Sequence, residues 1–186
     1  MTENHLYARG LTLVELMITI AVASILLSLA VPSFTTSIRN NRMVTDINEL
    51  HASLSFARSE AVKRDRNVTM CRSSNGSSCT GNWQDGWIVF VDNNFNGTVD
   101  AGDEILREHG ALGGGDTLTF SQTRVIYDSS GLARAGSNGT FTLCDSRGAQ
   151  SAKGLVIGVS GRPRLAIDSD SNGILEDENG DDLACS

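Results

Sequence analysis

The sequence predicts an α+β protein in which one long N-terminal helix carries a C-terminal antiparallel β domain. Residues 16–38 contain no charged side chain, whereas residues 39–66 are polar with hydrophobic side chains at three- and four-residue spacing. Beyond residue 67, hydrophobic and β-branched residues gather in short runs separated by Gly, Asn, Asp and Ser. The 186 residues suffice for one compact domain and an extended element, but not for two full cores.

The uncharged segment is long enough to cross a membrane. As a helix rising about 1.5 Å per residue, residues 16–38 span roughly 35 Å, and the hydrocarbon core of a bilayer is about 30 Å thick. The segment before it is short and polar and ends in Arg9-Gly10. An ordinary secretory signal has its cleavage site after the hydrophobic run. A candidate site in front of the run therefore indicates a different kind of processing.

Glu15 is the only charged residue between Gly10 and Arg39. A carboxylate near the end of a membrane span is costly unless it is paired or hydrated, and such residues are functional by default. Cleavage after Gly10 would leave a cationic amine on Leu11, one helical turn from Glu15. We therefore expect Glu15 to neutralise that amine on a neighbouring subunit when the helices pack together. The alternative is a plain membrane anchor with Glu15 in the headgroup region.

The stretch RGLTLVELMITIAVASILLSLAVPSF resembles the prepilin-type signal and N-terminal helix of type IV pilins and type II secretion pseudopilins. The resemblance implies the type IV pilin-like fold and cleavage between Gly10 and Leu11 by the prepilin peptidase, with methylation of the new N-terminus. Leu11 stands where many family members have Phe. The resemblance also implies a single-pass inner-membrane protein with a periplasmic C-terminal domain, which then joins other pilins in a pilus or pseudopilus. Pro32 removes one helical hydrogen bond and should kink or loosen the helix, as the matching proline does in pilins on assembly.

Residues 39–66 continue the predicted helix as an amphipathic half. Its hydrophobic stripe suits packing across a sheet and comprises Val44, Ile47, Leu50, Leu54, Ala57 and Ala61. Eight strands are expected beyond it, forming two antiparallel sheets, at 67–71, 86–92, 103–108, 117–120, 124–128, 139–145, 154–160 and 162–167. The predicted organisation is a leader at 1–10, a membrane-spanning and filament-core half-helix at 11–38, an amphipathic half-helix at 39–66 and a β-rich globular domain at 67–186.

The globular part resembles the FimT/FimU/GspH group of minor pilins and pseudopilins. The resemblance rests on ELHASLSFARSEAVKRDRNVTMCRSSNGSSC followed by WQDGWIVFVDNNFNGTVDAGDEILRE. It implies a minor pilin of a type IV pilus that contributes to assembly and priming and to DNA capture in natural transformation. The alternative is a GspH-like minor pseudopilin of the type II secretion system. No enzyme is expected, because the chain has neither a GxSxG nor an HExxH motif.

Four cysteines, Cys71, Cys79, Cys144 and Cys185, allow three complete pairings. None belongs to a CxxC motif and the chain has three histidines, which argues against a zinc site. A chain that exports its bulk across a membrane favours disulfides instead. We expect Cys71–Cys79 to close a small loop and Cys144–Cys185 to fix the C-terminal segment to the domain.

Two stretches resemble calcium loops, in which oxygen ligands alternate before a glycine turn. The first runs from Asp92 to Gly97, with Asp100 and Asp103 beyond it, and the second from Asp168 to Gly173. The second lacks the closing Glu of such loops. The alternative is that Asn, Asp and Gly simply form turns in both stretches, and no metal or cofactor is assigned to the protein.

The stretch VSGRPRLA contains a Gly-Arg-x-Arg motif with Arg162 and Arg164. Residues two apart on an extended strand project to the same face, and two guanidinium forks there suit successive phosphates. Pro163 indicates an edge or exposed segment. In FimT-like minor pilins such a motif is associated with DNA, so the resemblance implies sequence-independent contact with double-stranded DNA at Arg162 and Arg164.

The distribution of charge along the chain affects whether DNA can bind at these arginines. The net charge is −7, yet the chain beyond Leu165 holds seven acids and no Lys or Arg, which leaves fifteen acids and fifteen bases elsewhere. A local basic site is therefore compatible with the acidic composition. The acid-rich C-terminal segment would repel DNA if it folded back near the two arginines.

Overall fold

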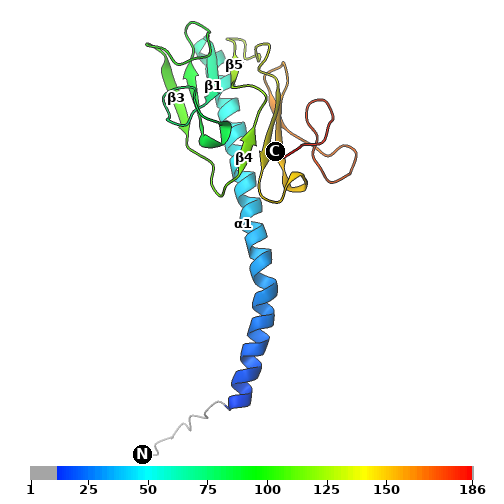
Figure 1. The fold of residues 1–186 in the computed structure, drawn as a ribbon. Coiled ribbons are helices and arrows are strands. Elements are labelled where there is room, and N and C mark those ends of the chain that lie inside the picture. The colour runs from blue at the N-terminus through cyan, green and yellow to red at the C-terminus, as the bar shows by residue number, and fades with distance from the viewer. Residues whose placement is uncertain (1–11, 186) are drawn as a thin grey trace, which may run out of the picture. The chain divides into compact units, whose positions relative to one another are not determined.

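A computed structural model describes residues 12–185, except for the side chain of Leu29. The chain divides into two compact units, Met1–Asn41 and Arg42–Ser186. One helix, α1 (Leu13–Arg64), begins in the first unit and ends in the second (Figure 1).

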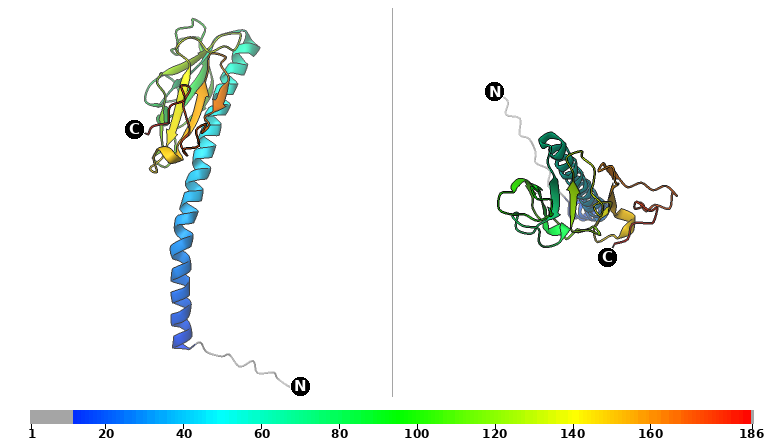
Figure 2. Two further views of the ribbon diagram at one scale, coloured as in Figure 1. Left: turned by 90° about the vertical axis from the view of Figure 1, so that its right-hand side faces the viewer. Right: turned by 90° about the horizontal axis from the view of Figure 1, so that it is seen from above.

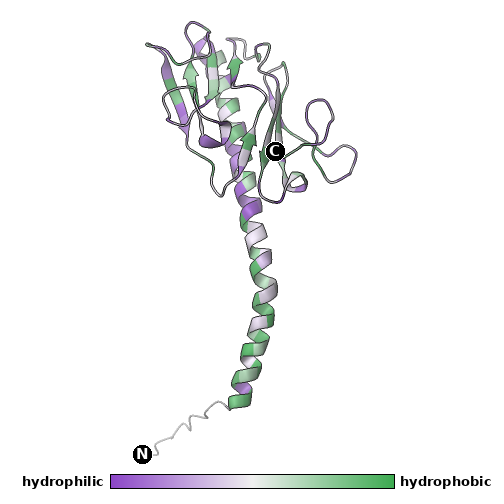
Figure 3. Cartoon of the chain, in the orientation of Figure 1, coloured by the Kyte–Doolittle hydropathy of each residue, from purple (hydrophilic) through white to green (hydrophobic). Residues whose placement is uncertain are grey.

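The first unit consists, in its described part, of the hydrophobic half of α1. Its segment between Leu16 and Ile38 is almost free of the purple that marks hydrophilic residues in Figure 3. The helix continues through Pro32 without a break. The expected loosening at this proline during assembly stays a prediction.

The second unit contains eight strands in two antiparallel sheets, one for each predicted run. Sheet A has the order β3-β2-β1-β5 and sheet B the order β4-β6-β7-β8. Figure 2 shows strands of sheet B, in yellow and orange, beside the C-terminal half of α1. The bounds are β1 (Val68–Arg72), β2 (Trp87–Val91), β3 (Glu104–His109), β4 (Thr117–Thr119), β5 (Arg124–Tyr127), β6 (Gly139–Cys144), β7 (Lys153–Ile157) and β8 (Pro163–Leu165), with 3₁₀ turns η1 (Trp83–Asp85) and η2 (Ala149–Ser151).

The stripe of α1 that faces the sheets differs from the predicted stripe at one end. Val44 is 46% exposed, and Met43 is fully buried in its place. The buried series then alternates steps of four and three residues, which keeps successive side chains on one helical face. Its members are Met43, Ile47, Leu50, Leu54, Ala57 and Ala61, and they share one core with residues of both sheets.

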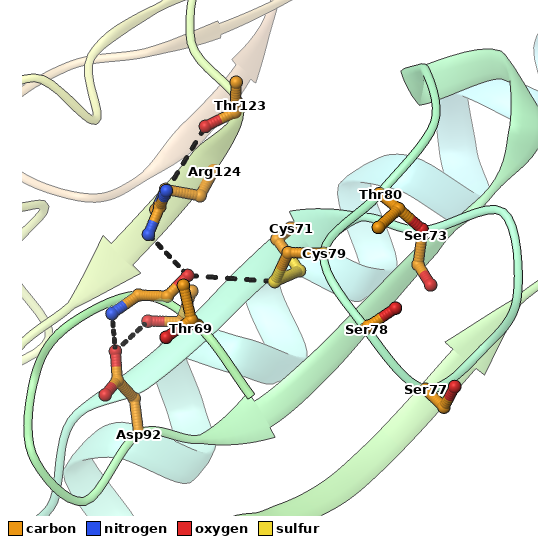
Figure 4. Close-up of a disulfide and its surroundings, with 12 residues drawn as sticks. Thr69, Cys71, Ser73, Ser77, Ser78, Cys79, Thr80, Asp92, Thr123 and Arg124 are labelled. Atoms are coloured by element: carbon orange, nitrogen blue, oxygen red, sulfur yellow. Dashed lines mark hydrogen bonds between the residues drawn. A yellow bond between two sulfur atoms is a disulfide. The ribbon is translucent and has the colours of Figure 1, made fainter. Parts of the chain in front are cut away.

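Each sheet also buries its outer face beneath a segment held by a disulfide. On sheet A, Ile88 and Phe90 form a small cluster with the Cys71–Cys79 disulfide, and Figure 4 shows this disulfide beside the loop of residues 73–80. On sheet B, the Cys144–Cys185 disulfide fixes the C-terminal segment, where Leu183 packs with residues of the sheet. Both predicted disulfide pairings are confirmed.

Side chains at the two ends of the loop between β3 and β4 contact α1. Arg42 donates through Nε and Nη2 to Asp116 Oδ2 and Oδ1, each at 2.7 Å. His109 Nε2 lies 2.5 Å from Glu49 Oε2, and the His109 ring stacks on Trp87 with centroids 3.9 Å apart. His109 therefore has a structural role at this junction.

Candidate assembly and ligand-binding sites

The first turn of α1 positions Glu15 by a capping box. The Glu15 backbone N–H donates to Thr12 Oγ1 at 3.2 Å, and Thr12 N and Oγ1 each donate to Glu15 Oε2 at 3.3 Å. The reciprocal bonds satisfy donors that a helix N-terminus leaves unpaired. Glu15 is therefore held at the helix start by its own chain, with its side chain exposed. The predicted cleavage site, Gly10 and Leu11, lies outside the described residues.

The segment after Glu15 presents hydrophobic side chains on all sides. The side chains described between Leu16 and Ile38 are all exposed, and α1 is the one helix within residues 12–185 that is long and apolar enough to cross a membrane. Hydroxyl groups within it donate to backbone carbonyls one turn earlier, which satisfies polar groups where water is absent. These donors are Thr19, Ser24, Ser28, Thr35 and Thr36.

The structure places Arg162 and Arg164 at the edge of sheet B. Arg162 precedes β8, and Arg164 lies in β8 opposite Val156 of β7. Both side chains are exposed, and neither forms an ion pair with any residue between 12 and 185. Pro163 occupies an edge strand, as predicted.

The acid-rich C-terminal segment folds back beside one of these arginines. Arg164 lines an open cavity of about 250 Å³ together with Glu176, Asp177 and Glu178. A DNA phosphate that approached Arg164 would therefore meet three carboxyl groups nearby. Arg162 does not line this cavity.

The first calcium-like stretch does not gather its carboxylates around one point. Among residues 12–185, only Asp168, Asp170 and Glu176 offer three acidic ligand atoms within 4.8 Å of one another. Asp92 instead accepts hydrogen bonds from Thr69 Oγ1 and Gly97 N, each at 2.8 Å. Its carboxylate thus closes a turn, as the alternative interpretation proposed.

In the folded chain, Glu176 lies beside the second calcium-like stretch, next to Asp168 and Asp170, which the sequence pattern did not predict. Glu176, only 6% exposed, accepts backbone N–H bonds from Ser169 at 2.9 Å and from Asp170 at 3.3 Å. Asp168 Oδ2 accepts the Gly173 N–H at 2.9 Å. Carboxylate oxygens in this arrangement suit a hard cation such as calcium, although backbone donors already occupy several of them. Glu176 follows Gly173 by three residues, whereas the motif requires an acid six residues after its glycine.

The comparisons with known proteins agree with this architecture. The family described as "Type II transport protein GspH" matches residues 46–161. The chain belongs to the GspH family. The motif described as "Prokaryotic N-terminal methylation motif" matches residues 6–31 of this GspH-family chain. The two matches cover most of the hydrophobic half of α1 and most of the globular unit, so the chain is a type IV minor pilin or pseudopilin.

One relative matches this GspH-family protein over most of both chains, and solved structures share its fold. Pilin-like protein PilA1 of Thermus thermophilus is 28% identical over 166 residues, which cover 84% of this chain and 97% of the relative. Two crystal forms of the type IV minor pilin FimU of Pseudomonas aeruginosa have the same fold. One has a TM-score of 0.55 at 22% identity, covering 69% of this chain and 91% of FimU. The other has a TM-score of 0.51 at 23% identity, covering 64% and 89%. The chain is thus a membrane-anchored pilin-type protein from a family of structural pilins that assemble with other pilins.

Proposed function

We propose that the protein is a minor pilin of a type IV pilus that contributes to assembly and priming. The observation that carries the proposal is a half-helix with exposed hydrophobic side chains, in which Glu15, in the first turn of α1, is the only acid between Leu13 and Ile38. In the membrane, lipid covers these side chains. In a filament, the same surface is covered by neighbouring helices, where an unpaired carboxylate would be costly.

Processing supplies the counter-charge. Cleavage by the prepilin peptidase between Gly10 and Leu11 frees a cationic amine, which is then methylated. Glu15 of one subunit pairs with this amine on the next subunit. The globular unit is carried outside the inner membrane in the periplasm and then enters the pilus.

The capping box allows the charge of Glu15 to be tested apart from its role in the helix. Glu15→Gln keeps an oxygen acceptor for the Thr12 donors but removes the charge. Thr12→Ala removes the two bonds of the Thr12 hydroxyl, leaves the backbone N–H of residue 12 as a donor to Glu15, and keeps the charge. We expect the Glu15→Gln chain to be processed yet to be depleted at least tenfold from sheared pili, and the Thr12→Ala chain to be incorporated. Equal incorporation of the Glu15→Gln chain, or a mature chain that keeps residues 1–10 by mass spectrometry, would refute the proposal.

The alternative function is that of a GspH-like pseudopilin in type II secretion, which the description of the matching family favours. Both machines use the same hydrophobic helix, so the phenotype must separate them. A deletion strain is scored for twitching, natural transformation and secretion. Loss of secretion alone would exclude the pilus.

A second role, contact with double-stranded DNA at Arg162 and Arg164, is favoured by the exposure of both arginines and the lack of ion-pair partners within residues 12–185. Binding to phosphates is sequence-independent and weakens steeply with salt. Mobility shift of the wild-type chain against Arg162→Ala/Arg164→Ala tests this role. Equal retention of DNA by both chains would dismiss it.

A further inference from the structure

A groove beside β5 carries two further arginines. It has a cavity volume of about 450 Å³, and Arg124 and Arg134 line it together with the polar residues Gln122, Thr123 and Ser137. No Asp or Glu belongs to its lining. The groove thus differs in charge from the cavity beside Arg164, where three acids take part.

Arg124 is fixed by the loop that resembles a calcium site. Its Nη1 donates to Gly97 O at 2.6 Å and to Asn96 O at 3.0 Å, and its Nε donates to Thr123 Oγ1 at 3.4 Å. A Cβ on Gly97, whose φ is +73°, would lie 2.4 Å from Arg124 Nη1, so the guanidinium packs directly on this glycine. Figure 4 shows the Arg124 side chain extending from β5 toward the segment that follows Asp92.

Arg134 is held by Phe95, the residue immediately before Asn96 and Gly97. Its Nη1 donates to Phe95 O at 3.2 Å, and its Cζ lies 4.3 Å from the centroid of the Phe95 ring. Phe95 has a φ of +63°, a conformation that bulky residues rarely adopt. The cation–π contact and the hydrogen bond favour this unusual position. Three consecutive carbonyls thus position two guanidinium groups over one groove.

These contacts position the arginines without neutralising them. Carbonyl oxygens are uncharged, and neither Arg124 nor Arg134 forms an ion pair within the described part of the chain. Arg42 and Arg147, by contrast, each pair with a carboxylate. Two adjacent cations without a counter-charge repel each other, which an anion between them would offset. Among residues 12–185, their hydrogen bonds use Nη1 of both and Nε of Arg124, so Nη2 of each can serve a ligand.

The geometry points to a binding groove for phosphate groups, in which Arg124 and Arg134 donate to one phosphate from two directions. A tetrahedral phosphate offers oxygens to several donors that do not share a plane, whereas a carboxylate matches a single planar fork. The side chains of Gln122 and Thr123 add neutral donors at the rim. The phosphate comes from a nucleic-acid backbone or from free polyphosphate. This site lies on sheet A and is separate from the proposed DNA contact at Arg162 and Arg164 on sheet B.

The test uses the full chain in a non-ionic detergent with two probes, a fluorescent 30-base-pair duplex and inorganic polyphosphate. Arg124→Gln/Arg134→Gln removes both forks, and Arg72→Gln/Arg107→Gln removes two charges elsewhere on sheet A as the matched control. We expect the groove variant to raise the Kd for the bound probe at least tenfold and to reduce the salt slope by about 0.9, the contribution of the one phosphate that both arginines hold. The control should stay within about threefold of wild type.

Further variants keep the outcome decisive. Arg124→Lys/Arg134→Lys retains the charge but not the fork, and we expect it to recover only part of the affinity. Arg134→Gln alone changes an exposed side chain, so it reports on the groove even if the double variant unfolds. A groove variant with the affinity of wild type for both probes would overturn the inference.

The outcomes separate this inference from the proposed DNA contact. Loss of DNA binding in Arg162→Ala/Arg164→Ala, together with unchanged binding of both DNA and polyphosphate in the groove variant, overturns the groove and leaves the proposed contact standing. Polyphosphate binding that depends on the groove, in a chain that does not bind DNA, supports the groove with free polyphosphate as the source and dismisses the DNA contact.

Discussion

The Cys144–Cys185 disulfide should contribute more to stability than the Cys71–Cys79 disulfide. The first joins residues 41 apart in sequence and the second residues 8 apart. A cross-link stabilises a fold by restricting the unfolded chain, and the effect grows with the length of the closed loop. By the loop-entropy relation, the longer loop contributes about 4 kcal/mol and the shorter one about 2.5 kcal/mol. Replacing each pair by alanine should therefore lower the free energy of unfolding by these amounts.

The two tryptophans make the globular unit easy to follow. Trp83 and Trp87 are the only tryptophans in the chain, and both are buried in the core of the second unit. Urea titrations followed by tryptophan fluorescence compare wild type, Cys144→Ala/Cys185→Ala and Cys71→Ala/Cys79→Ala. The reasoning fails if the longer loop contributes less than the shorter one. That result would mean that the C-terminal segment unfolds separately from the domain.

Three substitutions test other contacts by the same titration. Arg42→Met should cost about 2 kcal/mol, because it leaves the Asp116 carboxylate buried without its bidentate partner; a loss below 0.5 kcal/mol, on the order of a surface pair, would contradict this. Burial, reinforced by nearby acids, raises the pKa of Asp46 above its ordinary value of 3.8. Its contribution to stability is therefore largest when it is protonated and declines as pH rises from about 4 through the raised pKa. Asp46→Asn should gain stability over wild type as pH rises across this range, and a pH-independent difference would be inconsistent with the raised pKa. Gly161→Ala should cost about 1–3 kcal/mol, because φ is +71° and a Cβ would lie 2.5 Å from Gly131 O; unchanged stability would show that the turn relaxes.

The sequence predicted the elements of the fold because each depends on local periodicity. All eight runs became strands, and both disulfides joined the expected cysteines. The exchange of Val44 for Met43 in the buried stripe shows the limit of this approach. Both residues are hydrophobic and lie on neighbouring helical faces, so only the packing against the sheets decides between them. The capping box of Thr12 and Glu15, by contrast, is encoded locally as T-x-x-E but was not predicted.

Ligand sites were less predictable, because they depend on residues distant in sequence. The stretch from Asp92 to Gly97 has the pattern of a calcium loop, and its backbone does direct carbonyls at cations. These cations are the guanidinium groups of Arg124 and Arg134, which lie 27 or more residues away. No local pattern links these segments. The proximity of Glu176 to Asp168 likewise arises only when the C-terminal segment folds back.

The placement of acids decides which arginines can hold an anion. In water, one charge at about 4 Å contributes roughly 1 kcal/mol, and the contribution decreases with distance. Several acids beside Arg164 therefore offset much of the attraction that this arginine would offer to a phosphate. Arg124 and Arg134 avoid that loss because neutral carbonyls hold them. The stronger anion site of this acidic chain is therefore expected on sheet A, and Arg162 rather than Arg164 is expected to dominate any contact at the edge of sheet B.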